Sequence, residues 1–211
     1  GPTLEGQTDL RHVPLVTIDP IDARDHDDAV YAEPDEDPAN QGGWIVWVAI
    51  ADVAAYVRPG TPLDREARDK GNSVYFPDRV VPMLPEALSN GLCSLVPHED
   101  RGCLAVHMWI DADGNLRRNE FVRGIMRSAE RLTYEQVDGA RNGDPDDTTG
   151  PLLDDVIAPL YGAFEALQAA RIRRGTIDLE LPERKVKLDQ KGNLIGIEPV
   201  ARLDSHRLIE E

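Results

Sequence analysis

Five of the ten residues from position 19 to position 28 are aspartates, and they directly follow an apolar run at residues 15–18. The apolar run predicts a short buried strand, which would bring several carboxylates together where the strand ends. Neighbouring carboxylates repel one another, so something has to neutralise them. Mg²⁺ and Mn²⁺, which prefer oxygen ligands, suit this chemistry. Two such ions could stabilise both the attacking and the leaving oxygen of a phosphodiester during hydrolysis.

Other interpretations of the acidic segment compete with a catalytic metal site. On composition alone, a solvated acidic loop explains the segment as well as a metal site does. A Ca²⁺-binding module is a further alternative. An EF-hand loop is excluded, because its sixth position is Arg24 rather than glycine and its twelfth is Val30 rather than glutamate. The acidic runs at residues 35–37 and 144–147 follow no apolar strand, so we expect them to be solvated surface.

The overall charge is strongly negative, with 23 Lys and Arg against 39 Asp and Glu in 211 residues, a formal net charge of −16. Taken alone, this charge argues against a nucleic-acid partner. No apolar run approaches the roughly 20 residues of a membrane span, so no membrane partner is expected. We expect Cys93 and Cys103 to be buried, small apolar side chains in a cytoplasmic protein.

Apolar periodicity and turn residues predict a mixture of strands and helices, which places the chain in the α/β (mixed α+β) class, with a central mixed β-sheet flanked by helices. We expect a mobile acidic hairpin tip at residues 33–43. The expected strands are 15–18, 29–32, 44–50, 104–110, 116–122, 176–181, 185–188 and 194–198. The expected helices are 61–71, 85–90, 134–141, 151–174 with a kink or break at Pro159, and one that starts at Asp204 or Ser205.

The segment Val-Thr-Ile-Asp-Pro-Ile-Asp-Ala-Arg-Asp-His-Asp-Asp-Ala-Val at residues 16–30 resembles the catalytic signature of the RNase II/RNase R (RNB) family. Further matches follow in order at residues 47–53, 62–67, 73–77, 81–86, 88–95, 131–134 and 205–211, and they look closest to the bacterial RNase R branch. The resemblance implies a cytoplasmic, Mg²⁺-dependent, processive 3′→5′ exoribonuclease that releases nucleoside 5′-monophosphates. It also implies that residues 1–211 form the N-terminal half of an RNB catalytic domain.

Carried over by position, the resemblance implies roles for five residues. Asp19 and Asp28 would be direct metal ligands, and Asp25 and Asp27 would complete the metal shell or orient the attacking water. Tyr75 would stack on the terminal base at the 3′ end of single-stranded RNA, which is tolerant of base identity. The expected substrate is RNA rather than DNA.

Three family features have no counterpart in the sequence. Residues 184–188 hold no aromatic that could form the family's second stacking platform, and no Ser-Pro-Ile-Arg-type motif supplies its catalytic arginine. The flanking cold-shock and S1 domains, which are OB-folds, are also missing. We therefore expect this chain alone to be inactive or nearly so, and to need the remainder of the RNB domain or the OB-fold domains as partners. The alternative is a non-catalytic RNB-family module that binds RNA or a partner.

Two further side chains, one within the acidic segment and one after a later strand, could contribute to the site. We expect His26 to be a bystander, although it could ligate a metal ion or transfer protons. Asp52 follows the strongest predicted strand, and it could either approach the metal site or play a structural role in hydrogen bonding.

Overall fold

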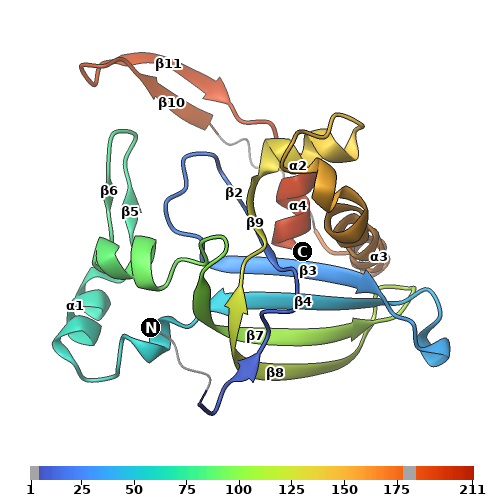
Figure 1. The fold of residues 1–211 in the computed structure, drawn as a ribbon. Helices are drawn as coiled ribbons and strands as arrows, with labels where there is room; N and C mark the ends of the chain where they lie inside the picture. The colour runs from blue at the N-terminus through green and yellow to red at the C-terminus, as the bar shows by residue number, and fades with distance from the viewer. Residues whose placement is uncertain (1–4, 178–183) are drawn as a thin grey trace.

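The computed structural model describes residues 5–177 and 184–211 and centres on a seven-stranded mixed sheet with the strand order β1-β8-β7-β4-β3-β2-β9 (Figure 1). The strands are β1 (Thr8–Asp9), β2 (Val16–Asp19), β3 (Asp28–Pro34), β4 (Trp44–Ala51), β7 (Asp100–Ile110), β8 (Leu116–Arg127) and β9 (Glu130–Thr133). Strands β2, β3, β4, β7 and β8 pair antiparallel with their neighbours, whereas β1 on β8 and β9 on β2 pair parallel. The mixed sheet and the α+β class are therefore confirmed.

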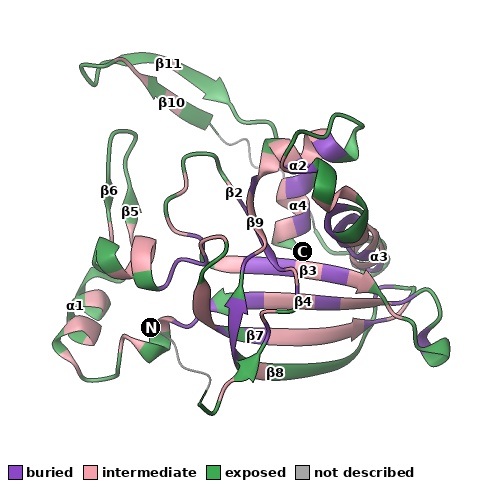
Figure 2. Cartoon of the chain, in the orientation of Figure 1, coloured by how far each residue is buried: buried purple, intermediate pink, exposed green. Residues whose placement is uncertain are grey.

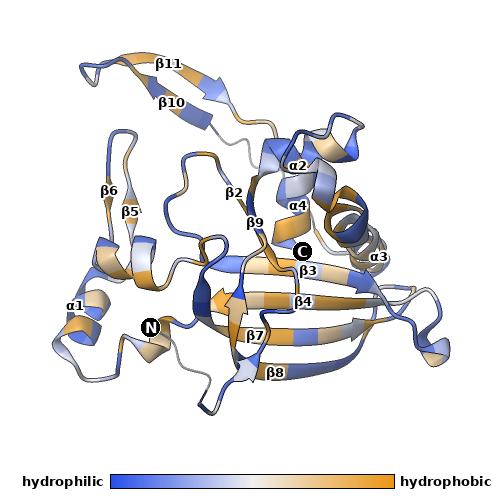
Figure 3. Cartoon of the chain, in the orientation of Figure 1, coloured by the Kyte–Doolittle hydropathy of each residue, from blue (hydrophilic) through white to orange (hydrophobic). Residues whose placement is uncertain are grey.

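Both faces of the sheet bury apolar side chains, because successive strand residues point to opposite faces. On one face, β2, β3 and β4 pack against the helices α2 (Tyr134–Arg141), α3 (Ala158–Arg173) and α4 (Asp204–Glu210), as Figure 2 shows. Gly162 brings α3 close to the sheet, since a Cβ atom there would lie 2.2 Å from the Trp44 ring. On the other face, Leu10, Val13 and Leu15 cover the small residues of β4 and β7. Figure 3 shows hydrophobic residues along the central strands β4 and β7, and also in α3 and β11.

Local sequence signals explain where several helices begin and end. In α1 (Pro62–Lys70), the Thr61 side chain accepts a hydrogen bond from the Asp64 N–H, and Gly71 ends the helix with a φ of 77°. Helix α2 starts with a capping box, in which Thr133 and Gln136 each bond the other's backbone N–H. These two helices confirm the predictions for residues 61–71 and 134–141.

Other predicted elements differ from the structure. The helix expected over 151–174, with a kink or break at Pro159, is a regular α-helix only from Ala158: residues 150–157 form short 3₁₀ and π turns, and Pro159 lies in the first turn of α3. The interruption expected at Pro159 is therefore confirmed, but the part before it is not α-helical. The short helix expected at 85–90 is instead Ala87–Leu92. The last helix, α4, begins at Asp204 as expected, with Leu203 rather than Asp204 or Ser205 at its N-cap, and the Ser205 hydroxyl in its first turn donates to the Tyr134 carbonyl at 2.8 Å. The strand expected at 176–181 falls largely outside the described residues.

The expected mobile tip at residues 33–43 is an ordered turn in the structure. Asp37 caps a 3₁₀ turn at Pro38–Asn40, and the buried Asn40 amide donates to the Asp35 carboxylate at 2.8 Å and to the Ile110 carbonyl at 3.1 Å. Because one side chain satisfies groups on two segments, the turn is tied to the end of β7.

Two small hairpins lie beside the main sheet: β5 (Val74–Tyr75) with β6 (Val80–Val81), and β10 (Arg184–Leu188) with β11 (Leu194–Pro199). Figure 1 shows both projecting on the same side of the sheet as the loop between β2 and β3. The second hairpin confirms the strands predicted at 185–188 and 194–198. None of the helices in the described part of the chain is long and apolar enough to span a membrane.

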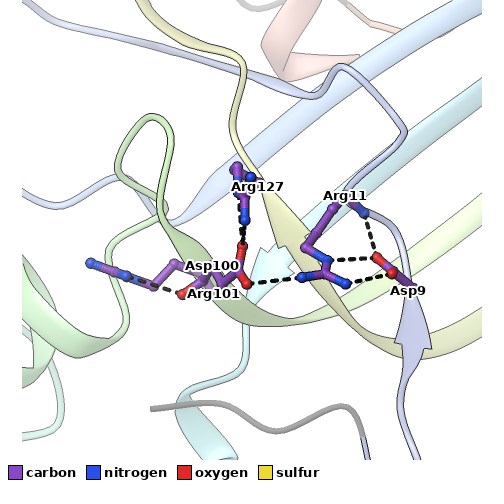
Figure 4. A network of polar contacts seen from close by, with 5 residues as sticks. All are labelled: Asp9, Arg11, Asp100, Arg101 and Arg127. Atoms are coloured by element: carbon purple, nitrogen blue, oxygen red, sulfur yellow. Dashed lines mark hydrogen bonds and ion pairs between the residues drawn. The ribbon is translucent and has the colours of Figure 1, made fainter.

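A network of charged side chains joins β1, β7 and β8 at one corner of the sheet (Figure 4). The Asp100 carboxylate accepts hydrogen bonds from Arg127 at 2.8 Å and from Arg11 at 3.2 Å, and Arg11 also bonds Asp9. Arg127 beside Asp100 lowers the pKa of that carboxyl. Arg101 donates to the Ser94 carbonyl at 2.9 Å, which attaches the segment around Ser94 to β7.

Candidate functional site

The acidic loop lies between two neighbouring strands of the sheet. Asp19 is the last residue of β2 and Asp28 is the first residue of β3, and these strands pair antiparallel at Val16 and Val30. The loop therefore leaves and re-enters the sheet at the same end, with Asp25 and Asp27 between. Asp28 pairs with Ile50 of β4, so its position is fixed by the sheet register.

The loop backbone is held by residues from other strands. The Arg131 guanidinium of β9 donates to the Ile21 carbonyl at 2.8 Å, and the Ala51 N–H donates to the Asp27 carbonyl at 2.8 Å. Lys185 of β10 forms an ion pair with Asp22 at 3.2 Å. Asp22 is the one aspartate of the loop to which the resemblance assigns no role, and here it links the loop to the β10–β11 hairpin.

Electrostatic coupling shows which carboxylates share the site. Desolvation by surrounding protein atoms raises the pKa of Asp28, and the charges of Asp19 and Asp27 raise it further. Desolvation also raises the pKa of Asp27, with added contributions from Asp25 and Asp19. The charges of Asp19 and Asp25 therefore reach Asp27, and those of Asp19 and Asp27 reach Asp28, so the site favours binding of positive charge.

The donor set is chemically suited to a hard divalent cation, because it consists of carboxylate oxygens that repel one another in the absence of positive charge. Among the described residues, however, no group of three His, Cys, Asp or Glu side chains converges in the arrangement of a metal site. A cation at this position would have to draw the carboxylates closer together.

His26 is buried and contacts the first aspartate directly. Its Nδ1 atom lies 2.8 Å from Asp19 Oδ2. Its main chain is bonded on both sides, since the N–H donates to the Ser94 hydroxyl at 3.1 Å and the carbonyl accepts from the Leu95 N–H at 2.8 Å. The sequence predicts His26 to be a bystander, and the structure places its imidazole in direct contact with the Asp19 carboxylate.

Asp52 belongs to a different interaction. Its buried carboxylate accepts two hydrogen bonds from the Arg123 guanidinium of β8, at 2.6 Å and 2.7 Å. Of the two roles left open by the sequence, the structure supports the structural one.

The predicted base-stacking residue lies on the surface of the β5–β6 hairpin. Tyr75 is 67% exposed, and Phe76 and Val80 beside it are also about half exposed. The Arg79 guanidinium lies over the Phe76 ring, 4.8 Å from its centroid. The Tyr75 ring is thus not a packing residue, and its exposure leaves it accessible to a planar ligand.

Sequence reasoning assigned no role to Tyr134, which the structure places beside the acidic loop. Burial and the charges of Asp19, Asp28 and Glu210 raise the pKa of its phenol to about 12. Its ring stacks on that of His206 in α4, with ring centroids 4.0 Å apart. The only sequence signal for Tyr134 was its place in the motif at residues 131–134. The distance of that motif from the acidic loop along the chain gave no indication that Tyr134 lies near Asp19 and Asp28.

Comparison with known proteins identifies the family. A model of the RNB domain matches residues 7–211. The chain belongs to the RNB family. Ribonuclease R of Escherichia coli (strain K12) is 49% identical over 208 residues, covering 98% of this chain and 25% of the relative. Ribonuclease R of Vibrio parahaemolyticus is 48% identical, with coverages of 98% and 24%.

A solved structure of a relative matches the whole fold of this RNB chain. Mycoplasma genitalium RNase R in complex with ribose methylated single-stranded RNA superimposes with a TM-score of 0.92 and 32% identity, covering 100% of this chain and 33% of that one. The chain thus spans about a quarter to a third of the length of the relatives that it matches.

Proposed function

We propose that this RNB chain carries the metal-binding half of a Mg²⁺-dependent hydrolytic 3′→5′ exoribonuclease that releases nucleoside 5′-monophosphates from RNA. Membership of the RNB family and similarity to proteins named Ribonuclease R support the reaction class. The observation that carries the proposal is the position of Asp19 and Asp28 at adjoining strand ends, where burial and the charges of Asp19 and Asp27 raise the pKa of Asp28.

In the proposed site, Asp19 and Asp28 would hold Mg²⁺, or Mn²⁺ in its place, and Asp25 and Asp27 would complete the set of oxygen ligands. The bound ions would supply Lewis-acid activation of the scissile phosphate and of the attacking water. Tyr75 would stack on the base at the 3′ end of single-stranded RNA, without selecting its identity. The exposed position of Tyr75 on the β5–β6 hairpin supports this role.

We propose further that the 211-residue chain is inactive or nearly so by itself. A positive charge that stabilises the transferring phosphate is worth orders of magnitude in rate, and the sequence contains no Ser-Pro-Ile-Arg-type motif to supply it. The remainder of an RNB domain, or flanking OB-fold domains, would be the partners that complete the site. A bacterial cytoplasm is the location that we propose.

A second candidate function is a non-catalytic module that binds RNA or a protein partner. The observation that favours it is that, in the described part of the chain, no three His, Cys, Asp or Glu side chains lie close enough together to hold a metal ion. A module of this kind would bind single-stranded RNA through Tyr75 and would not need the aspartates.

A chimera tests the two candidates against each other. Residues 7–211 replace the matching quarter of the E. coli relative, and the purified chimera is given 5′-labelled single-stranded RNA with Mg²⁺. The catalytic proposal predicts stepwise 3′→5′ shortening, which is lost on addition of a chelator and in the Asp27→Asn chimera. The non-catalytic alternative predicts RNA binding without shortening in a chimera whose circular dichroism shows it to be folded.

A further inference from the structure

We propose that His26 is a positioning residue, which holds the Asp19 carboxylate in the orientation needed to bind a divalent cation. The proposal rests on the proposed function, since it assigns a partner to one of the proposed metal ligands. It comes from the contact between the two side chains, and the sequence alone favours no role for His26.

The contact is short and shielded from water. His26 Nδ1 lies 2.8 Å from Asp19 Oδ2, and the two side chains are 6% and 14% exposed. An ionised carboxylate can only accept hydrogen bonds, so Nδ1 must carry the proton that is shared. Hydrogen bonds to a charged acceptor are about twice as strong as neutral ones, and few water molecules compete here. The bond therefore restricts rotation of the Asp19 carboxylate.

The main chain of His26 is held in place by a second segment of the chain. The fully buried Ser94 accepts from the His26 N–H, and the Leu95 N–H donates to the His26 carbonyl. Arg101 of β7 in turn bonds the Ser94 carbonyl at 2.9 Å. The main chain of His26 is thus connected to β7 through Ser94 and does not depend on the neighbouring aspartates for its position. This restricts where the imidazole can lie.

The hydrogen bond from His26 goes to Oδ2 of Asp19, and Oδ1 of the same carboxylate takes no part in it. A ligand carboxylate that is oriented by one hydrogen bond loses less conformational freedom when it binds a cation. Partners of this kind, next to metal ligands, typically contribute about 10–100-fold to metal affinity. We therefore expect His26 to strengthen cation binding without being a ligand.

The experiment titrates Mn²⁺ into the 211-residue chain and measures bound metal by electron paramagnetic resonance. His26→Asn keeps an N–H donor near the position of Nδ1, whereas His26→Gln places its amide near the position of Nε2, and His26→Phe keeps only a ring. His12→Phe, at an exposed histidine outside the acidic loop, is the control. We expect the Mn²⁺ Kd to rise about 10-fold or more in His26→Gln and His26→Phe, and to stay near that of the unaltered chain in His26→Asn and His12→Phe.

Equal Mn²⁺ affinity in the unaltered chain, His26→Gln and His26→Phe would overturn the positioning role while leaving the proposed function intact. Equal weakening in His26→Asn and His26→Gln would also overturn it, because the Nδ1 position would then not matter. The Asn and Gln pair decides the question even if His26→Phe does not fold. Absence of saturable Mn²⁺ binding by the unaltered chain would instead remove the proposed metal site, and the role of His26 with it.

Discussion

The Asp52 carboxylate accepts two hydrogen bonds from the Arg123 guanidinium, with Nε 2.6 Å from Oδ2 and Nη2 2.7 Å from Oδ1. Asp52 is 6% exposed, so its carboxylate has little access to water, whereas Arg123 reaches solvent. The pair joins the end of β4 to β8 and raises the pKa of Arg123, chiefly through the hydrogen bonds to Asp52. It accounts for an aspartate whose place after the predicted strand at 44–50 left its role open.

We predict that Arg123→Ala lowers stability without changing metal affinity. Leaving a buried carboxylate without its partner costs about 1–3 kcal/mol, so the midpoint of urea unfolding should fall. Asp52→Asn combined with Arg123→Ala should lose less stability than Arg123→Ala alone. A clear loss of Mn²⁺ affinity in folded Arg123→Ala would contradict the assignment and place Asp52 in the metal site.

Replacing a carboxylate of the acidic loop should stabilise the metal-free chain. The pKa of Asp28 is higher in the folded state than in the unfolded chain. Ionisation of Asp28 therefore lowers the stability of the fold once the pH rises above the pKa of the unfolded chain, and the full cost is present above the pKa of the folded state. In the presence of a chelator near neutral pH, Asp28→Asn should raise Tm, where about 1 kcal/mol corresponds to roughly 2–4 °C. Added Mn²⁺ should raise the Tm of the unaltered chain more than that of the variant. A lower Tm for Asp28→Asn in chelator would show that the carboxylate is stabilised by other contacts.

Removal of the exposed ring on the β5–β6 hairpin should weaken RNA binding without affecting the fold. Stacking on an aromatic ring contributes about 1–3 kcal/mol per base, which corresponds to roughly 5–150-fold in affinity. Fluorescence anisotropy with a short single-stranded RNA, in chelator to prevent hydrolysis, should show this loss in Tyr75→Ala and little change in Tyr75→Phe. Val81→Ala, on the partner strand of the hairpin, is the matched control. Tyr75→Ala binding as tightly as the unaltered chain would rule out stacking at this position.

His107 should make stability depend on pH. It is sandwiched between Trp47 and Trp109, with ring centroids 3.8 Å away on each side, and its Nε2 is buried without a hydrogen-bond partner. Burial lowers its pKa, so the unfolded chain takes up a proton more readily and stability falls as the pH drops below about 6.5. His107→Phe should therefore lose less stability than the unaltered chain between about pH 7.5 and about pH 5.5. Urea unfolding at both pH values measures the difference, and equal losses would contradict the prediction.

Local patterns predicted the elements that depend on local physics. Thr61 and Gly71 bounded α1 because capping is settled within a few residues, and the strands predicted at 104–110 and 116–122 pair as β7 and β8 across the short connection between them. The strand-to-loop transition at Asp19 was predictable because an apolar run ends there. The long apolar repeat after residue 150 was misleading, because its first turns pack on the core without forming a regular α-helix.

Contacts between distant segments could not be predicted in this way. Nothing in the spacing of Arg123 and Asp52, 71 residues apart, indicates a bidentate pair. The same holds for Ser94, which supports His26 from 68 residues away. These contacts arise from the sheet register and loop packing, so the candidate ligands were predictable from the sequence, whereas the groups that position them were not.

Saturable binding of Mn²⁺ to the 211-residue chain tests the central claim most directly. Electron paramagnetic resonance titrations should show saturable binding that Mg²⁺ displaces, and Asp27→Asn and Asp28→Asn should each weaken it strongly while remaining folded. Asp37→Asn, in the turn at the far end of β3, should leave it unchanged. No saturable binding, or binding that survives both loop substitutions, would contradict the claim that the aspartates after β2 form the metal site of a nuclease.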